Sequence, residues 1–194
     1  MIIWLNGAFG SGKTQTAYEL NRRLQNSYVY DPEEAGFFIR DNLPGDIKKS
    51  DFQDYPLWRE FNSGMIRYIS ENYDGHIIIP MTVTNKQYYQ EIIQPISAKR
   101  PVRHFILYAS KKTLLKRLAS RFESKRSWGA QQIDRCMKAF DHDITETKIY
   151  TDHLKIPQVA EEIASALGLS LADDKRSPFR KRIDRVVIQY KHIR

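Results

Sequence analysis

Residues 2–14 read IIWLNGAFGSGKT, and this stretch decides the fold class. Ile2 to Asn6 have the apolar, β-branched character of a buried strand. Gly7 to Thr14 follow the pattern Gly-x-x-x-x-Gly-Lys-Thr and lead directly into a helical pattern. A glycine-rich loop between a strand and a helix turns backbone N–H groups towards phosphate oxygens, and the helix adds its positive N-terminal end. The stretch is therefore a P-loop.

The P-loop predicts ATP binding and gives its residues individual roles. Lys13 is expected to reach the β- and γ-phosphates, and the Thr14 hydroxyl to bind the Mg²⁺ ion that bridges them. The predicted ATP-binding residues are Gly7, Ala8, Phe9, Gly10, Ser11, Gly12, Lys13 and Thr14. Neither Asn-Lys-x-Asp nor Asp-x-x-Gly occurs, which argues against a GTPase. Residues 77–82 form an apolar strand pattern without a terminal acidic residue, which argues against a motor or AAA-type ATPase. A small-molecule kinase is the expectation that remains.

The rest of the chain alternates strand and helix patterns. Further strands are expected at 28–30, 77–83, 102–108 and near Ile149, and helices at 13–24, 57–71, 86–96, 111–121, 131–140 and 158–167. Strands that are apolar nearly throughout belong in a parallel sheet covered on both faces. The pattern predicts a doubly wound α/β fold, with a P-loop domain over 1–171, a lid around 117–135, and a linker and helix over 172–194.

Charge and composition argue against several classes of function. Eight of the 31 basic residues and one of the 23 acidic residues lie in 175–194, so this tail carries +7 of the net charge of +8. The body is nearly neutral, and we expect no nucleic-acid partner. With one cysteine, Cys136, neither a disulfide framework nor a multi-cysteine metal site is expected. No apolar run reaches membrane-span length and no signal-peptide pattern is present, which predicts a cytoplasmic protein.

Asp31 is the first candidate for a catalytic base. It follows the second strand, and in a doubly wound sheet that end opens onto the ligand crevice. A carboxylate there could accept the proton of a substrate hydroxyl or hold Mg²⁺ through water. Because Pro32 follows, the alternative is that Asp31 caps a helix, and one residue can do both. Glu33 is a second, weaker candidate.

Two further segments carry candidate site residues. Arg117 and Arg121 lie one helical turn apart, where a lid would bring cations onto the transferred phosphoryl group, with Arg126 and Arg135 as additional candidates. A solvated basic helix face is the alternative. Between the second and third strands, residues 51–59 read DFQDYPLWR, and Tyr55, Trp58 and Arg59 are expected to bind a planar acceptor. The alternative is a helix start with Trp58 anchored in the core.

The tail predicts an amphipathic helix. Its apolar residues recur at helical spacing and form one stripe: Phe179, Ile183, Val186, Val187, Tyr190 and Ile193. Basic residues cover most of the remaining surface. Such a helix can lie on an anionic membrane, or it can pack its stripe on the protein's own body. Both remain open at this point.

Together these segments are familiar. The P-loop, YVYDPE at 28–33, DFQDYPLWR at 51–59, LLKRL at 114–118 and QQIDRC at 131–136 make the chain resemble the bacterial tunicamycin resistance proteins of the P-loop nucleoside kinase-like superfamily. The resemblance covers nearly the whole chain. It implies a five-stranded parallel sheet in the order 2-3-1-4-5, ATP with Mg²⁺ at the P-loop, and protection against tunicamycin, an acylated nucleoside that contains uridine.

The resemblance leaves the mechanism open. The protein could phosphorylate tunicamycin, with Asp31, Lys13, Arg117 and Arg121 as catalytic residues. It could instead sequester the drug in an ATP-dependent way, or it could be a metabolic nucleoside kinase.

Overall fold

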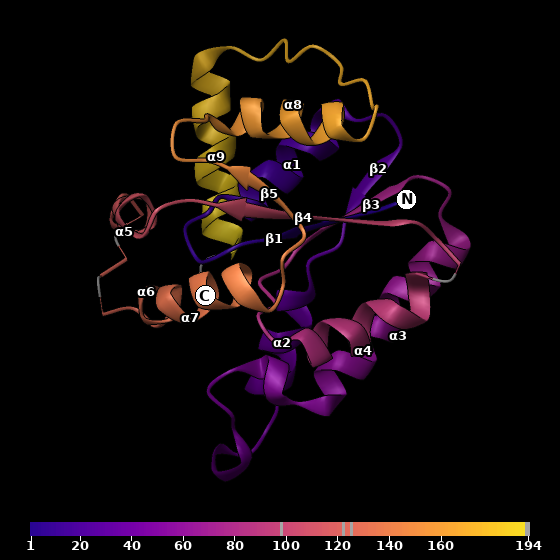
Figure 1. The fold of residues 1–194 in the computed structure, drawn as a ribbon, viewed down its shortest axis with the longest axis vertical. Coiled ribbons are helices and arrows are strands. Elements are labelled where there is room, and N and C mark those ends of the chain that lie inside the picture. Colours follow the sequence, from indigo (N-terminus) through magenta and orange to yellow (C-terminus); the bar gives the residue numbers. More distant parts are fainter. Residues whose placement is uncertain (98, 122, 125, 193–194) are drawn as a thin grey trace.

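Five parallel strands form one sheet in the order β2-β3-β1-β4-β5, as the resemblance implies (Figure 1). The computed structural model describes residues 1–97, 99–121, 123–124 and 126–192. The strands are β1 Ile2–Asn6, β2 Ser27–Val29, β3 His76–Pro80, β4 Val102–Tyr108 and β5 Thr147–Tyr150. β1 lies at the centre, so the loop that follows it opens in the middle of the sheet's carboxyl edge.

Helices connect the strands. They are α1 Lys13–Arg23, α2 Pro32–Asp41, α3 Pro56–Asn72, α4 Lys86–Ser97, α5 Lys111–Ala119, α6 Trp128–Gln131, α7 Ile133–His142, α8 Ile156–Ala166 and α9 Pro178–His192, with short 3₁₀ turns η1 Gly45–Ile47 and η2 Phe52–Asp54. α1 and α8 lie on one face of the sheet, and α3 and α4 lie on the other (Figure 1).

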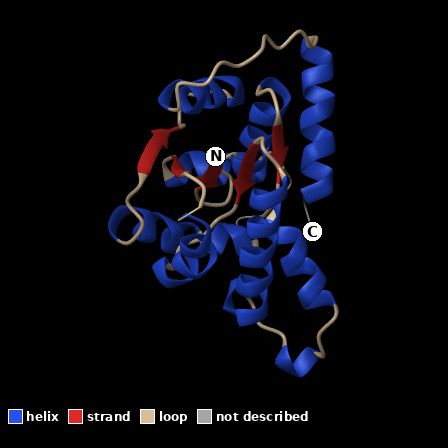
Figure 2. Ribbon diagram, turned by 90° about the vertical axis from the view of Figure 1, so that its right-hand side faces the viewer, coloured by secondary structure: helices blue, strands red, loops and turns tan. Residues whose placement is uncertain are grey.

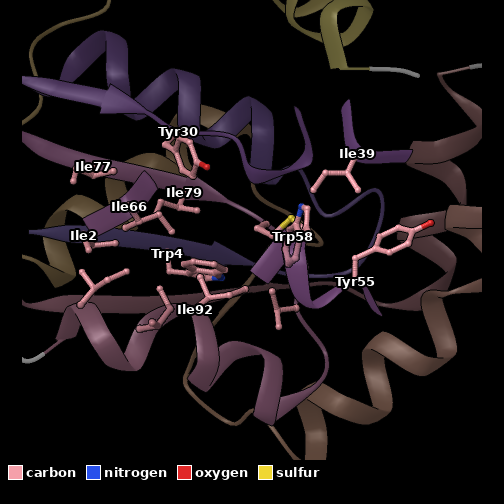
Figure 3. Packing of buried hydrophobic residues seen from close by; sticks show 14 residues of the cluster. Ile2, Trp4, Tyr30, Ile39, Tyr55, Trp58, Ile66, Ile77, Ile79 and Ile92 are labelled. Carbon is pink, nitrogen blue, oxygen red and sulfur yellow. The ribbon is translucent and has the colours of Figure 1, made fainter. Parts of the chain in front are cut away.

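Successive side chains of β1 point to opposite faces of the sheet and contribute to the hydrophobic core on each face. Ile2 and Trp4 point to the α3/α4 side, whereas Ile3 and Leu5 point to the α1/α8 side, and all four are fully buried. Figure 3 shows the first of these clusters, in which Trp4 and Trp58 are the largest members. Burial on both faces explains why the strands are apolar nearly throughout.

Several boundaries differ from the sequence prediction. β3 ends at Pro80, because Thr82 and Val83 turn towards the P-loop. α2 was expected only as the alternative role of Asp31, and it is a full helix of ten residues. The helix predicted over 131–140 is divided into α6 and α7 at Gln132.

α9 runs beside the body after a long loop and contacts α1 (Figure 2). Its apolar stripe does not pack on the body: Phe179, Ile183, Val186, Val187 and Tyr190 are between 38% and 86% exposed. Ile193 of the predicted stripe lies outside the described residues. The other side of the helix, with the buried Ile188, faces the protein. None of the described helices has the length and apolarity needed to cross a bilayer.

Candidate functional site

The P-loop adopts a conformation that requires its glycines. Gly10 and Gly12 have φ values of +83° and +99°, in the left-handed region that favours glycine. A Cβ on Gly10 would lie 2.9 Å from the carbonyl oxygen of Leu114, so the loop packs closely on α5. Gly12 is the N-cap of α1 and offers no side chain to its first N–H groups. Those donors are available to an anion such as a phosphate.

Lys13 lies in this loop and is only 8% exposed. Its Nζ donates hydrogen bonds to the carbonyl oxygens of Gly7 (3.0 Å) and Ala8 (3.4 Å). Burial lowers the pKa of Lys13, and the nearby Glu33 opposes this shift. Beside it, the buried Ser11 Oγ has no hydrogen-bond partner within the described part of the chain. A cationic amine and an unpaired hydroxyl next to an N-terminal helix end fit the phosphates of a nucleotide.

The end of β3 supports the loop instead of supplying an acid. Thr82 donates its hydroxyl hydrogen to the Gly7 carbonyl oxygen at 2.8 Å. Asn6 Oδ1 accepts from the N–H groups of Gly7 (2.9 Å) and Val83 (3.0 Å), and its Nδ2 donates to the Val83 carbonyl at 2.8 Å. These buried bonds fix the P-loop to the neighbouring strand. The only sequence signal for this role is the polar Thr82 after an apolar strand.

A cavity of about 540 Å³ begins at the P-loop and extends towards α2 and η2. Its phosphate side consists of Gly10, Gly12, Lys13, Thr14 and Arg121, and Phe37 and Phe52 contribute aromatic rings to its far side. The remaining lining residues are Phe9, Glu33, Phe37, Arg40, Ser50, Phe52, Gln53, Met81, Leu118, Glu123, Ser127, Trp128 and Gly129. One continuous space therefore joins a phosphate-binding loop to an apolar wall.

Phe37 and Phe52 form the centre of that wall. Their ring centroids are 5.9 Å apart in an edge-to-face arrangement, and the Arg40 guanidinium lies 5.2 Å from the Phe37 ring. Phe52 rests directly on Gly36 of α2, where a Cβ would lie 2.5 Å from its ring. A planar, partly apolar ligand fits against such a surface.

Tyr55 and Trp58, predicted to stack on the acceptor, are not among the residues that line the cavity. Trp58 is fully buried in the core (Figure 3). Its Nε1 donates to the Pro32 carbonyl oxygen at 3.0 Å. Tyr55 is only 7% exposed. Both lie behind the wall, because α3 begins at Pro56 and turns Trp58 inwards. Phe52 of the same segment and Phe37 of α2 line the cavity in place of Tyr55 and Trp58.

Arg59 also lies behind the wall. Its Nη1 donates to the backbone carbonyl of Gln53 at 2.6 Å, it pairs with Glu91, and it stacks on the Tyr88 ring at 4.1 Å. Arg59 therefore holds Gln53 in place and is not itself part of the lining.

Asp31 is the N-cap of α2, and its Oδ1 accepts the Glu33 N–H at 3.0 Å. The carboxylate is near enough to Lys13 to raise the pKa of that amine slightly. Glu33, one turn into the helix, lines the cavity and has the larger influence on Lys13. The structure thus shows the capping role of Asp31 and places both carboxylates near the P-loop lysine, and of the two only Glu33 is among the residues that line the cavity.

The predicted lid arginines occupy different positions. Arg121 lines the cavity, and burial lowers its pKa. Arg117 Nη1 contacts Thr151 Oγ1 (3.0 Å) and the Ser11 carbonyl oxygen (3.4 Å), so it joins the P-loop to the segment after β5. Arg135 pairs with Asp51 at 3.1 Å. Arg126 is exposed.

Thr14 lines the phosphate side of the cavity, as expected for a Mg²⁺ ligand. Among the described residues, no group of three or more His, Cys, Asp or Glu is arranged to hold a metal. A magnesium ion that arrives with nucleotide takes most of its ligands from phosphates and water, and one hydroxyl is a fitting protein contribution.

Comparisons with known proteins agree with this geometry. Residues 2–142 match the AAA domain family. This match overturns the expectation, drawn from the missing acidic residue at 77–82, that the chain is not AAA-type; β3 nevertheless ends without an acid. No curated protein matches the chain.

Among solved structures, the tunicamycin resistance protein of Deinococcus radiodurans is 32% identical, with a TM-score of 0.75, over 89% of this chain and 98% of that one. A sugar kinase from Janibacter sp. HTCC2649 (14% identity, TM-score 0.61, 87% and 94% of the two chains) and deoxyadenosine kinase from M. mycoides (16%, 0.56, 87% and 99%) share the fold. The chain belongs to the P-loop, kinase-like family that includes the D. radiodurans tunicamycin resistance protein.

Proposed function

We propose that this protein transfers the γ-phosphoryl group of ATP to a hydroxyl of a nucleoside antibiotic of the tunicamycin type, and that this reaction confers resistance. The observation that carries the proposal is the continuous cavity that joins the P-loop to the Phe37–Phe52 wall. It offers a phosphate site and a site for a planar acceptor group in one space, which a phosphotransferase requires. The kinship with a tunicamycin resistance protein supports the choice of acceptor.

In the proposed reaction the acceptor hydroxyl oxygen forms a bond to the γ-phosphorus. The bond from that phosphorus to the β,γ-bridging oxygen breaks, and ADP leaves with the electron pair. Lys13 and Arg121, both on the cavity wall, stabilise the charge on the phosphoryl oxygens. Thr14 would hold the Mg²⁺ ion that arrives with ATP, and this ion would neutralise phosphate charge. Arg117 fixes the P-loop through the Ser11 carbonyl.

Asp31 is the proposed acceptor of the hydroxyl proton. Its capping bond to the Glu33 N–H holds the carboxylate in one orientation near Lys13. Replacing Asp31 by Asn keeps a capping side chain but removes the base, whereas Glu33→Gln removes the carboxylate with the larger influence on the pKa of Lys13. We expect Asp31→Asn to lower kcat about 100-fold or more with ATP binding retained. Loss of kcat only in Glu33→Gln would transfer the role to Glu33.

The direct test is to incubate purified protein with tunicamycin, Mg²⁺ and ATP and to weigh the recovered drug by mass spectrometry. A gain of one phosphoryl group is the expected result. An unchanged drug mass, with protein that binds both ligands, would contradict phosphorylation.

Sequestration of the drug is the second candidate, and the capping role of Asp31 favours it, since a cap needs no catalytic function. In that case ATP binding only closes the site. Asp31→Asn would then leave tunicamycin binding and cellular protection intact.

We also propose that α9 contacts an anionic membrane. Its exposed stripe and the basic residues around it support this, because buried apolar area and attraction to anionic headgroups add. Sedimentation with vesicles of phosphatidylglycerol, compared with phosphatidylcholine, tests the proposal. Val186→Asp is expected to abolish binding to the anionic vesicles, and equal sedimentation of the variant would contradict it.

A further inference from the structure

Gln53 is a polar residue on the cavity wall whose side-chain amide has no hydrogen-bond partner in the described part of the protein. It is 5% exposed and lines the cavity next to Phe52. Within residues 1–97, 99–121, 123–124 and 126–192, its side-chain amide makes no hydrogen bond. The amide atoms are not among the fully buried polar atoms, so they are open to the cavity, and an amide that has no partner in the protein can form its hydrogen bonds with a ligand there.

The backbone of Gln53 is held from both sides. Its N–H donates to Asp51 Oδ1 at 3.0 Å, and its carbonyl oxygen accepts from Arg59 Nη1 at 2.6 Å. Asp51 is itself paired with Arg135, and Arg59 with Glu91. A residue fixed in this way presents its amide at a defined position, which limits the entropy lost when a ligand binds.

Phe52 and Phe37 form the aromatic surface beside that amide, with their rings edge to face. Phe52 cannot move towards α2, because Gly36 already touches its ring, and it also packs on Trp58 with centroids 5.3 Å apart. The rigid aromatic surface and the adjacent amide together match a flat heterocycle with polar edge groups, for which stacking and edge hydrogen bonds act at the same time.

From this arrangement we infer that Gln53 is the residue that reads the base of the acceptor, by pairing its amide with the edge of a pyrimidine ring. The inference rests on the proposed function and deepens it. A glutamine amide offers one N–H donor and one carbonyl acceptor side by side. A uracil edge offers the complement, an N3–H donor next to a carbonyl acceptor. The pair of hydrogen bonds selects rings whose edge places a donor next to an acceptor, and it rejects rings in which that donor is blocked.

Two ligands that differ in one hydrogen-bond donor test the inference. Uridine has the N3–H group, and N3-methyluridine carries a methyl group in its place. Each is titrated as a competitor of tunicamycin binding, measured by calorimetry in the presence of Mg²⁺ and a non-hydrolysable ATP analogue. For the wild-type protein we expect uridine to compete about 10-fold to 100-fold better than N3-methyluridine.

Gln53→Met keeps the length of the side chain and removes both hydrogen-bonding groups. We expect it to weaken tunicamycin binding about 10-fold to 100-fold and to abolish the preference for uridine, with ATP binding unchanged. Gln90→Met, on the exposed side of α4, is the matched control and leaves all three quantities unaltered. Thermal unfolding of both variants separates loss of recognition from loss of fold.

The outcomes distinguish this inference from the function on which it rests. Equal competition by uridine and N3-methyluridine, or an undiminished preference in Gln53→Met, would overturn the role of Gln53 while drug phosphorylation stands. If wild-type protein binds ATP but neither tunicamycin nor uridine, both the proposed function and the inference fail.

Discussion

Nη2 of Arg135 lies 3.1 Å from Oδ2 of Asp51, and this ion pair joins α7 to the segment that precedes α3. Asp51 is buried, and its other oxygen accepts the Gln53 N–H. The end of the predicted lid is therefore connected to the Phe37–Phe52 wall through one carboxylate. Movement of α7 is expected to alter the position of Gln53.

The first prediction separates the two tasks of Asp51. Asp51→Asn and Arg135→Gln each remove the ion pair but keep an oxygen at position 51 that can accept the Gln53 N–H. Asp51→Ala removes both the ion pair and this oxygen. We expect the first two variants to lose less than about 1 kcal/mol in the free energy of unfolding, because the Arg135 side chain is 48% exposed. Asp51→Ala should lose about 1 kcal/mol more. Urea unfolding measures this, and equal losses in all three variants would contradict it.

The second prediction concerns the cost of burying Lys13. Burial lowers its pKa, so the charged amine is held in the fold against a desolvation penalty. Lys13→Met should therefore abolish ATP binding and cellular protection without lowering the thermal midpoint. Lys112→Met, on the exposed face of α5, is the control for loss of one positive charge. Retained protection in cells with Lys13→Met would refute the nucleotide-dependent account.

The sequence predicts the fold because its strongest signals are local. The P-loop pattern and the apolar runs of β1, β3 and β4 each fit in one window, and the body's alternation of strand and helix leaves few topologies. α2 was harder to predict, because Asp31-Pro32 is equally a site signal and a helix start. Family resemblance, and not periodicity, supplied the strand order.

The individual residues of the Phe37–Phe52 wall could not be predicted from the sequence. An aromatic segment signals a pocket, but the 3₁₀ turn η2 followed by α3 decides which ring faces it: Phe52 lines the cavity and Trp58 enters the core. No sequence pattern marks Gln53 as a site residue, because its proposed role depends on an amide without a protein partner, and only the three-dimensional contacts reveal this. For α9, periodicity identified an apolar stripe but not the side on which it lies.

The third prediction uses two glycines with opposite surroundings. A Cβ on Gly36 would lie 2.5 Å from the Phe52 ring, whereas a Cβ on Gly64, within α3, meets nothing within 4 Å. Gly64→Ala should stabilise the protein by about 0.5–1 kcal/mol, because alanine favours helix. Gly36→Ala should raise the acceptor KM by displacing Phe52, with ATP binding preserved. Steady-state kinetics and urea unfolding check both, and unchanged acceptor KM in Gly36→Ala would show that Phe52 does not contact the acceptor.

The last prediction concerns the attachment of α9 to α1. Arg176 binds Asp174 and Asp184 at 2.7 Å each and the buried Glu19 of α1 at 2.9 Å, and Lys181 adds a contact to Asp174 at 3.1 Å. The hydrogen bond from Arg176 holds the pKa of Asp174 well below its usual range.

A carboxyl group whose pKa is lower in the folded state stabilises the fold at pH values above its unfolded pKa, which is about 3.9. This contribution is lost as the pH falls from about 4 towards the folded pKa. The attachment of α9 should therefore be unchanged between pH 8 and 5 and weaken below about pH 4.

Asp174→Asn should cost about 1 kcal/mol at pH 7 after solvent screening and remove part of the acid sensitivity. Hydrogen exchange of the α9 amides at pH 7, 5 and 3.5 measures the effect, with the exposed Asp173→Asn as control. Acid-induced exchange that is equal in Asp174→Asn and wild type would show that other groups hold the helix.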